Sequence, residues 1–225
     1  MGVRKSKIFE VYESDDFRKR KLYTANLVPG KKAYGENIAV QDGIEYREWD
    51  AGSSKLASLI LNGCTNTGIR NGDVVLYLGS STGTTVSHVS DIVGKEGFVF
   101  ALDVAPRVMR DLVFMCEDRK NIAPILADAN KPDSFKDRVM EADVLYQDIA
   151  QKNQVEIFLK NVKAFLKKGG YALLAVKARN IDVTRNPKDI FRQVRAELES
   201  HLTIIDFRTL DPYQRDHCMF VCKRQ

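Results

Sequence analysis

The spacing of apolar residues along the chain changes at about residue 52. Before this point, short runs rich in aromatic and β-branched residues are separated by turn signals that contain Gly, Pro and Asp. Such runs predict short antiparallel strands joined by tight turns. The predicted strands cover residues 8–12, 22–28 and 44–49. The basic run at residues 18–21 would lie on this small sheet, most simply as a solvated strand.

From Ser53 onward, strand and helix patterns alternate. Ser53 or Ser54 would cap a helix whose apolar face carries Leu56, Leu59 and Ile60. Apolar strand patterns follow at residues 73–79, 98–103, 122–127, 142–147 and 171–178. The helices between them are clearest at residues 105–119 and 152–167, and Gly169 and Gly170 are expected to close the second one. Alternation of this kind predicts a parallel sheet with helices on both faces.

The rhythm changes again near the C-terminus. After a helix at about residues 188–200, two strands at residues 202–210 and 217–222 are joined by a segment too short for a parallel crossover. The sequence therefore predicts an α/β fold in which a doubly wound, mostly parallel sheet ends in an antiparallel hairpin. This is the architecture of class I methyltransferases. We expect a small β domain at residues 1–52 and the α/β domain at residues 53–225.

Composition narrows the class of protein. The 225 residues are 44% hydrophobic and 29% charged, and the net charge of +5 permits a polyanionic partner without requiring one. Because no apolar run is long enough to span a membrane and no signal region is visible, we expect an intracellular protein without membrane contact. The four cysteines lack metal-ligand spacing, and Cys218 and Cys222 are expected to fill core. We also assign His88 and His201 to structural roles.

A glycine-containing turn after the strand at residues 73–79 indicates a ligand site. Gly79 and Gly83 let the backbone turn sharply, and a helix is expected to open at Thr84. The spacing is not the dinucleotide fingerprint, and the P-loop lysine is missing. Asp103, twenty residues beyond Gly83, ends the next strand and could accept hydrogen bonds from both ribose hydroxyls of an adenosine. A nucleoside without a pyrophosphate fits best, and S-adenosylmethionine is the common one.

Three successive predicted strands end in aspartate. In doubly wound sheets, ligands bind beyond these strand ends. Asp103 suits the ribose, Asp128 suits the adenine amino group, and Asp148 would lie nearest the reacting end. Helix caps or solvated loop acids would explain any one of them, but they explain all three poorly.

Lys177 is the candidate for acid–base chemistry. It ends an otherwise uncharged strand, so its ammonium is expected to emerge, partly desolvated, beside Asp148. Held there, it could accept or share the proton of an attacking hydroxyl, provided that Lys55 and partial burial favour its uncharged form. His217, at the start of the last strand, lies near the same edge. A Lys-Asp-Lys set beside S-adenosylmethionine suits methylation of an alcohol such as the ribose 2′-hydroxyl.

The chain resembles the fibrillarin family. The segments that carry the resemblance are residues 34–36, 45–49, 54–57, 76–79, 83–91 and 215–217. Fibrillarin is the RNA 2′-O-methyltransferase of box C/D ribonucleoproteins. The resemblance implies methylation of ribosomal and transfer RNA at sites chosen by a guide RNA, with a Nop-family scaffold and a kink-turn-binding ribosomal-type protein as partners.

The resemblance also implies roles for individual residues. The catalytic set would be Lys55, Asp148, Lys177 and His217. The cofactor positions that it implies are Thr84, Thr85, Asp103, Val104, Asp128, Ala129, Asp148, Ile149, Ala150 and Gln151. Gly79 and Gly83 of the turn join this set, and no metal is expected. Asp103 departs from the more usual Glu but keeps the carboxylate. The Gly/Arg-rich tail of eukaryotic members is absent, which favours the archaeal type and hence the cell interior of an archaeon over a nucleolus.

Three other functions share part of the pattern. A nicotinamide dehydrogenase has the same strand, glycine turn and acid, but it leaves Lys55, Lys177 and the terminal hairpin unexplained. A catalytically silent scaffold would not need the acids and lysines at the strand ends. A protein glutamine methyltransferase would use much the same cofactor pocket.

Overall fold

The computed structural model describes residues 2–16 and 20–225. Arg18 and Lys19 of the predicted basic run lie outside these residues. The other two members of the run, Arg20 and Lys21, pair with carboxylates of neighbouring strands, each at 2.7 Å. The two described residues of the run therefore form ion pairs within the sheet.

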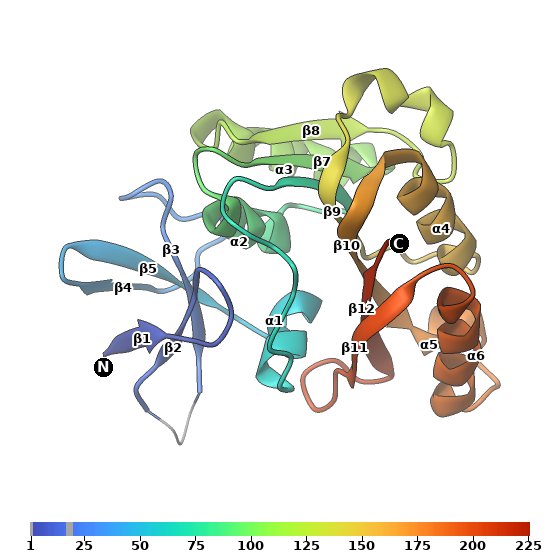
Figure 1. Cartoon of the computed structure of the whole chain (residues 1–225). Helices are drawn as coiled ribbons and strands as arrows, with labels where there is room; N and C mark the ends of the chain where they lie inside the picture. Colours follow the sequence, from blue (N-terminus) through green and yellow to red (C-terminus); the bar gives the residue numbers. More distant parts are fainter. Residues whose placement is uncertain (1, 17–19) are drawn as a thin grey trace.

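Five short antiparallel strands form the N-terminal sheet, in the order β1-β2-β3-β5-β4 (Figure 1). They are β1 (Val3–Lys5), β2 (Val11–Ser14), β3 (Leu22–Ala25), β4 (Ile38–Gln41) and β5 (Ile44–Trp49). The predicted strand at residues 8–12 is wrong in its position, because Ile8 lies in a turn whose Ser6 hydroxyl accepts from the Ile8 amide. Ile8 packs into the core below the sheet. Its apolar side chain therefore reflects burial in the core and not a place in a strand.

A seven-stranded sheet follows, in the order β11-β12-β10-β9-β6-β7-β8. Its strands are β6 (Val74–Leu78), β7 (Phe98–Asp103), β8 (Ile122–Leu126), β9 (Ala142–Gln147), β10 (Leu166–Lys177), β11 (Thr203–Thr209) and β12 (His217–Lys223). Strands β6 to β10 pair in parallel, and β12 pairs antiparallel with both β10 and β11. The strand order reverses between β6 and β9, which is where ligands bind in sheets of this kind. The predicted fold class is confirmed.

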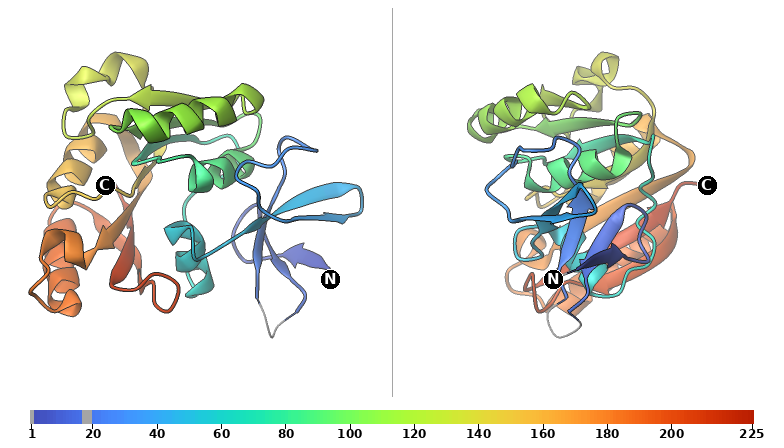
Figure 2. Two further views of the ribbon diagram at one scale, coloured as in Figure 1. Left: turned by 180° about the vertical axis from the view of Figure 1, so that it is seen from behind. Right: turned by 90° about the vertical axis from the view of Figure 1, so that its left-hand side faces the viewer.

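Helices cover both faces of this sheet, as Figures 1 and 2 show. They are α1 (Lys55–Leu61), α2 (Thr84–Val93), α3 (Pro106–Asp118), η1 (Pro132–Ser134), η2 (Lys136–Arg138), α4 (Gln154–Phe165), α5 (Ala178–Ile181) and α6 (Pro187–Glu199). One core joins α1, α2 and α3 to one face and to the N-terminal sheet, and the other joins α4 and α6 to the opposite face. Alternate residues of each strand enter the two cores. Cys218 and Cys222 pack in the second core, as predicted. Within residues 2–16 and 20–225, no helix has the length and hydropathy to cross a bilayer.

The junction between α4 and β10 differs from the prediction. The helix expected to run to residue 167 ends at Phe165, and β10 begins at Leu166, which pairs with Ala142 of β9. The register shifts before Tyr171. Gly169, with a φ of 76°, allows this irregularity within the strand. The glycines therefore mark a bulge in a strand and not the end of a helix.

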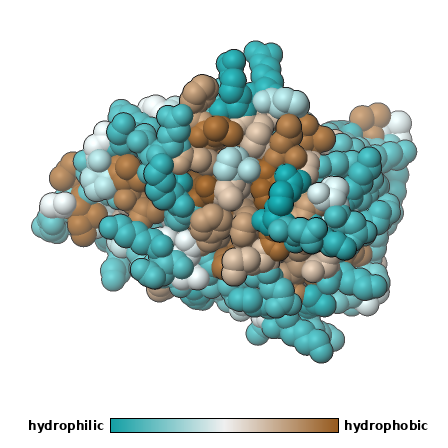
Figure 3. Space-filling view, turned by 90° about the horizontal axis from the view of Figure 1, so that it is seen from above, coloured by the Kyte–Doolittle hydropathy of each residue, from teal (hydrophilic) through white to brown (hydrophobic). Residues whose placement is uncertain are grey.

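Strand β8 forms one edge of the large sheet. The surface that includes this edge, seen from above in Figure 3, carries a group of hydrophobic side chains ringed by hydrophilic ones. Leu126 of β8 is among the exposed hydrophobic residues. The Ala127 amide donates to the Asp103 carbonyl of the neighbouring strand β7. Because successive amides of a strand point to opposite sides, the amide position of Pro124 faces away from β7, toward the open edge. Proline has no N–H there, so this apolar edge is poorly suited to pair with another strand.

A buried cluster of charges joins the N-terminal sheet to α2. Asp91 of α2 accepts from Arg47 of β5 at 2.6 Å and from Arg119 at 2.7 Å, and all three side chains are almost completely buried. Glu36 is the second carboxylate partner of Arg47, so two cations face two anions. The cluster thus fixes the N-terminal sheet against the helix that begins at the glycine turn. The division of the chain into domains at residue 52 stays a prediction.

Removal of the central carboxylate should destabilise the protein strongly. In Asp91→Asn, Arg47 and Arg119 would stay buried with only Glu36 as a counter-charge, and loss of one partner of a buried ion pair costs about 3–5 kcal/mol. Urea unfolding measures this change. Asp118→Asn is the matched control, because Asp118 pairs with Lys31 on the surface and such pairs contribute about 0–1 kcal/mol. Equal losses in the two variants would contradict the assignment.

His88 of α2 lies inside the same region as a neutral ring. Its Nδ1 is 2.8 Å from the Thr24 hydroxyl and its Nε2 is 2.6 Å from the Tyr34 hydroxyl. The Thr24 hydroxyl donates to Asp91, so it accepts from Nδ1–H of His88. Burial lowers the pKa of His88 well below its usual value, and Arg47 and Arg119 lower it further. The structural role expected for His88 is in agreement with these contacts.

Stability should therefore fall in mild acid. The pKa of His88 is lower in the folded chain than in the unfolded chain. Below pH about 6.5, the proton therefore binds to the unfolded chain and not to the folded one, and this binding lowers the free energy of unfolding. We expect the free energy of unfolding to be flat above this pH and to fall by up to about 1.4 kcal/mol per pH unit below it. His217, whose pKa burial also lowers, adds to the slope.

Urea unfolding between pH 7.5 and 5 tests this expectation. His88→Gln should have a shallower pH dependence than wild type, whereas His201→Gln, at an exposed position, should keep it. An unchanged slope in His88→Gln would show that other groups control acid stability.

Candidate active site

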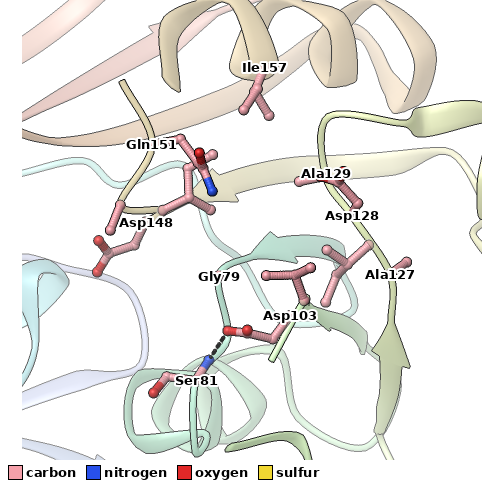
Figure 4. Close-up of a pocket in the computed structure, with 13 residues that line it drawn as sticks. Gly79, Ser81, Asp103, Ala127, Asp128, Ala129, Asp148, Gln151 and Ile157 are labelled. Atoms are coloured by element: carbon pink, nitrogen blue, oxygen red, sulfur yellow. Dashed lines mark hydrogen bonds between the residues drawn. The ribbon is translucent and has the colours of Figure 1, made fainter. Parts of the chain in front are cut away.

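A cavity of about 280 Å³ opens at the carboxyl ends of β6, β7, β8 and β9. Its lining is drawn in Figure 4 and consists of Gly79, Ser81, Leu102, Asp103, Val104, Ala127, Asp128, Ala129, Asp148, Ile149, Ala150, Gln151 and Ile157. Nine of the predicted cofactor positions are in this set. The structure therefore brings the acids at the ends of three strands to one cavity, as the sequence predicts.

Asp103 is fixed in the cavity by two backbone amides. Its Oδ2 accepts from the Ser81 amide at 2.8 Å (Figure 4), and its Oδ1 accepts from the Ala105 amide at 3.0 Å. Each carboxylate oxygen has a second lone pair that a ligand hydroxyl can use. Asp128 lies across the cavity in Figure 4, and its Oδ1 accepts from the Asn130 amide. Both acids are thus held by the backbone and still have acceptor capacity.

The two glycines of the turn have different physical roles. Gly79 has a φ of 85°, and a Cβ there would lie 2.1 Å from the carbonyl oxygen of Asp148, so the turn can pass the end of β9 only with glycine. Gly83 has a φ of 96°, and a Cβ there would collide with Met115 and Leu112 of α3. Gly79 lines the cavity and Gly83 does not.

Thr84 and Thr85, predicted at the cofactor, are also absent from the cavity lining. The Thr85 hydroxyl instead donates to the Ser54 hydroxyl at 3.0 Å. Ser54 is the N-cap of α1 and accepts from the Ala57 amide. The sequence indicated the cap but not this link between the starts of α1 and α2.

Asp148 pairs with Lys55, the first residue of α1. The Lys55 ammonium lies 2.7 Å from Oδ2 of Asp148, and the two side chains are 23% and 24% exposed. The expectation that Asp148 holds Lys177 is wrong, because Lys177 is exposed and has no ion pair among the described residues. The helix preceding β6 brings Lys55 closer to the end of β9 than the strand end brings Lys177.

His217 and Lys177 lie at the same edge of the sheet. They are directly opposite each other in the antiparallel pair of β10 and β12. His217 Nδ1 donates to the Arg215 carbonyl at 2.6 Å, which leaves Nε2 as the acceptor of the neutral ring. Burial lowers the pKa of His217; the Arg215 hydrogen bond and Asp148 oppose this change, whereas Lys55 and Lys177 add to it. His217 is therefore near enough to Lys55, Asp148 and Lys177 for their charges to influence its ring.

Gln214 ties two segments of the site together, and sequence reasoning missed it. Its amide nitrogen donates to the Ala51 carbonyl at 3.2 Å and to the Gly52 carbonyl. Figures 1 and 2 show the hairpin loop that contains it beside α1. The loop before His217 is thereby anchored to the segment before Lys55. No local pattern in the sequence signals a contact over 163 positions.

The chemistry of the lining favours one class of ligand. Of the described residues that line the cavity, three are Asp and none is Lys or Arg, whereas Leu102, Ile149 and Ile157 supply apolar walls. A pyrophosphate would be repelled here, and a nucleoside that carries a positive charge would be attracted. S-Adenosylmethionine, with its adenosine and sulfonium, fits this set of residues. Among the described residues, no group of three or more His, Cys, Asp or Glu could hold a metal ion.

Comparison with known proteins identifies the family. A sequence model of fibrillarin matches residues 3–225. A fibrillarin-like rRNA/tRNA 2′-O-methyltransferase of Thermococcus gammatolerans is 46% identical over the full length of both chains. The crystal structure of Aeropyrum pernix fibrillarin with natively bound S-adenosyl-L-methionine matches with a TM-score of 0.91 and 43% identity, covering 99% of this chain and 98% of that one.

A fibrillarin chain from a fibrillarin/Nop5p complex matches with a TM-score of 0.88 and 40% identity, covering 98% of this chain and all of the other. The fold, the acidic cavity and the full-length similarity agree with one another. The chain belongs to the fibrillarin family.

Proposed function

We propose that this chain is an S-adenosylmethionine-dependent RNA 2′-O-ribose methyltransferase that modifies ribosomal and transfer RNA within a box C/D ribonucleoprotein. One observation carries the proposal: Asp148 lines the acidic cavity and is also the partner of Lys55. The donor site and the acid–base groups therefore meet at a single carboxylate. The 2′-O-methyltransferase relative and the solved structure with bound S-adenosyl-L-methionine support the same reaction and cofactor.

Bound S-adenosylmethionine would supply a methyl group already activated by its sulfonium. Asp103 would accept from the ribose hydroxyls and Asp128 from the adenine amino group, since both keep free acceptor capacity. Val104, Ala129, Ile149, Ala150 and Gln151 would form the walls around them. Asp148 would lie at the reactive end, because it is the cavity acid that contacts the predicted catalytic lysine.

The remaining work is to align a hydroxyl and remove one proton. Lys55 holds the Asp148 carboxylate in place. This pair would orient the acceptor hydroxyl, and the carboxylate would accept the proton that the hydroxyl loses. His217 has a neutral Nε2 beside these groups, and the exposed Lys177 ammonium has no ion pair in the described part of the chain. Lys177 would therefore contact the acceptor strand rather than Asp148.

Partner molecules would position the RNA. The net charge of this chain is only +5, which is small for a protein that binds RNA without partner proteins. The fibrillarin/Nop5p complex supports a Nop-family partner. We extend the proposal to a guide RNA and a kink-turn-binding ribosomal-type protein, which would select the target nucleotide.

Calorimetric titration and a methyl-transfer assay test the proposal together. S-Adenosylmethionine should bind and NAD should not, because three carboxylates face the cavity. Asp103→Asn should weaken S-adenosylmethionine binding by about 1.5–3 kcal/mol for each charge-assisted bond lost, whereas Asp111→Asn, on an exposed part of α3, should not. With labelled cofactor, guided RNA should be methylated efficiently only when the partner proteins are present. Tight NAD binding, or labelling of protein but not RNA, would overturn the proposal.

A double-mutant cycle tests the catalytic pair. Lys55→Ala and Asp148→Ala should each reduce turnover about a hundredfold or more, and the double variant should be little worse than the worse single one, because the two groups act as a unit. Lys177→Ala and Asp148→Ala should instead combine multiplicatively, since the two side chains are not paired. Turnover is measured in the assembled complex with guided RNA. Strong coupling of Asp148 to Lys177 but not to Lys55 would contradict the assignment.

A further inference from the structure

The hairpin loop between β11 and β12, residues 210–216, is held rigidly beside the proposed catalytic groups. The Leu210 amide donates to the His217 carbonyl, and the Gln214 amide donates to the Leu210 carbonyl, each at 2.9 Å. The Gln214 side chain anchors the middle of the loop to residues 51 and 52. At its end, Asp216 pairs with Arg179 at 3.1 Å. The loop is thus fixed at its start, its middle and its end.

Two large side chains of this loop have no polar or aromatic partner within residues 2–16 and 20–225. Tyr213 is 41% exposed, and within the described residues its ring has no aromatic or cation–π contact and its hydroxyl has no hydrogen bond. Arg215 is exposed, and its guanidinium has no ion pair or hydrogen bond to any described residue. Aromatic rings that stack on bases and cationic groups that contact the backbone are the side chains with which proteins bind single-stranded nucleic acid.

The loop also leads directly into His217, one of the proposed catalytic groups. Arg215 precedes His217 by two residues, so their Cα atoms are at most about 7 Å apart. Lys177 lies opposite His217, and its ammonium is also unpaired among the described residues. Asp211 is the opposing charge, at the other end of the loop from Arg215. Positive charge therefore gathers on the side of His217 and Lys177.

We propose that Tyr213 and Arg215 bind the RNA strand next to the nucleotide that is methylated. Tyr213 stacks on a flanking base and Arg215 pairs with a backbone phosphate. This inference rests on the proposed function, because it takes RNA as the methyl acceptor. It assigns to the loop a task that the cofactor cavity does not perform: holding the acceptor strand after the guide has selected it.

Steady-state kinetics in the assembled complex test the proposal. Tyr213→Ala should raise the KM for RNA about fivefold or more, because loss of base stacking has effects of this size, and Tyr213→Phe should stay near wild type because it keeps the ring. Arg215→Ala should raise the KM for RNA on the order of tenfold. It should also reduce the salt dependence of RNA binding by about one phosphate contact. The KM for S-adenosylmethionine should not change in either variant.

Arg110→Ala is the matched control, since it removes the same charge from an exposed position on α3. It should leave the KM for RNA and its salt dependence as in wild type. An unchanged KM for RNA in both Tyr213→Ala and Arg215→Ala would overturn the inference. Loss of assembly with the Nop-family partner in these variants would also overturn it, because the loop would then be a protein interface. A wild-type complex that methylates no RNA would instead contradict the proposed function itself.

Discussion

A carboxylate without access to water, that of Asp91, holds two guanidinium groups from distant parts of the chain. Arg47 comes from the N-terminal sheet and Arg119 from the segment after α3, so one residue of α2 fixes three parts of the fold. Because each buried charge would be costly without its partner, the sheet and the helix can pack in only one relative position. His88 stays neutral for a related reason: a further positive charge beside the two arginines would be unfavourable.

This constraint reaches the proposed active site through α2. The helix is fixed at its C-terminal end by Asp91, and its N-terminal end lies at the turn beside the cavity. There Thr85 donates to Ser54, the residue before Lys55, and Lys55 pairs with Asp148. A continuous set of contacts therefore connects the N-terminal sheet to the carboxylate at the reactive end. The small sheet can influence the geometry of methyl transfer without touching either reactant.

The sequence predicted the parts of the site that depend on local pattern. Asp103, Asp128 and Asp148 were found because each lies at or just after the end of an apolar strand, and parallel strands end at a common edge. The partner of Asp148 was missed, because the pairing of residues 55 and 148 depends on how α1 packs and not on any spacing. Gln214 and Ile157 were missed for the same reason. The predicted end of α4 was wrong, because a glycine such as Gly169 can form a bulge in a strand as readily as it can end a helix.

The charges of the site are divided between its two sides. The cavity side carries Asp103 and Asp128 without a cation in its described lining. The other side carries Lys177 and Arg215, whose cationic groups have no ion pair to any described residue. Asp148 lies at the boundary, already neutralised by Lys55. A positively charged methyl donor and a polyanionic acceptor are thus each attracted to their own side and repelled from the other. Had Lys177 been paired with Asp148, as the sequence suggested, the acceptor side would have lost one of its two exposed cations that have no ion pair among the described residues. Because Asp148 pairs with Lys55 instead, the exposed Lys177 ammonium stays available for the proposed contact with the acceptor strand.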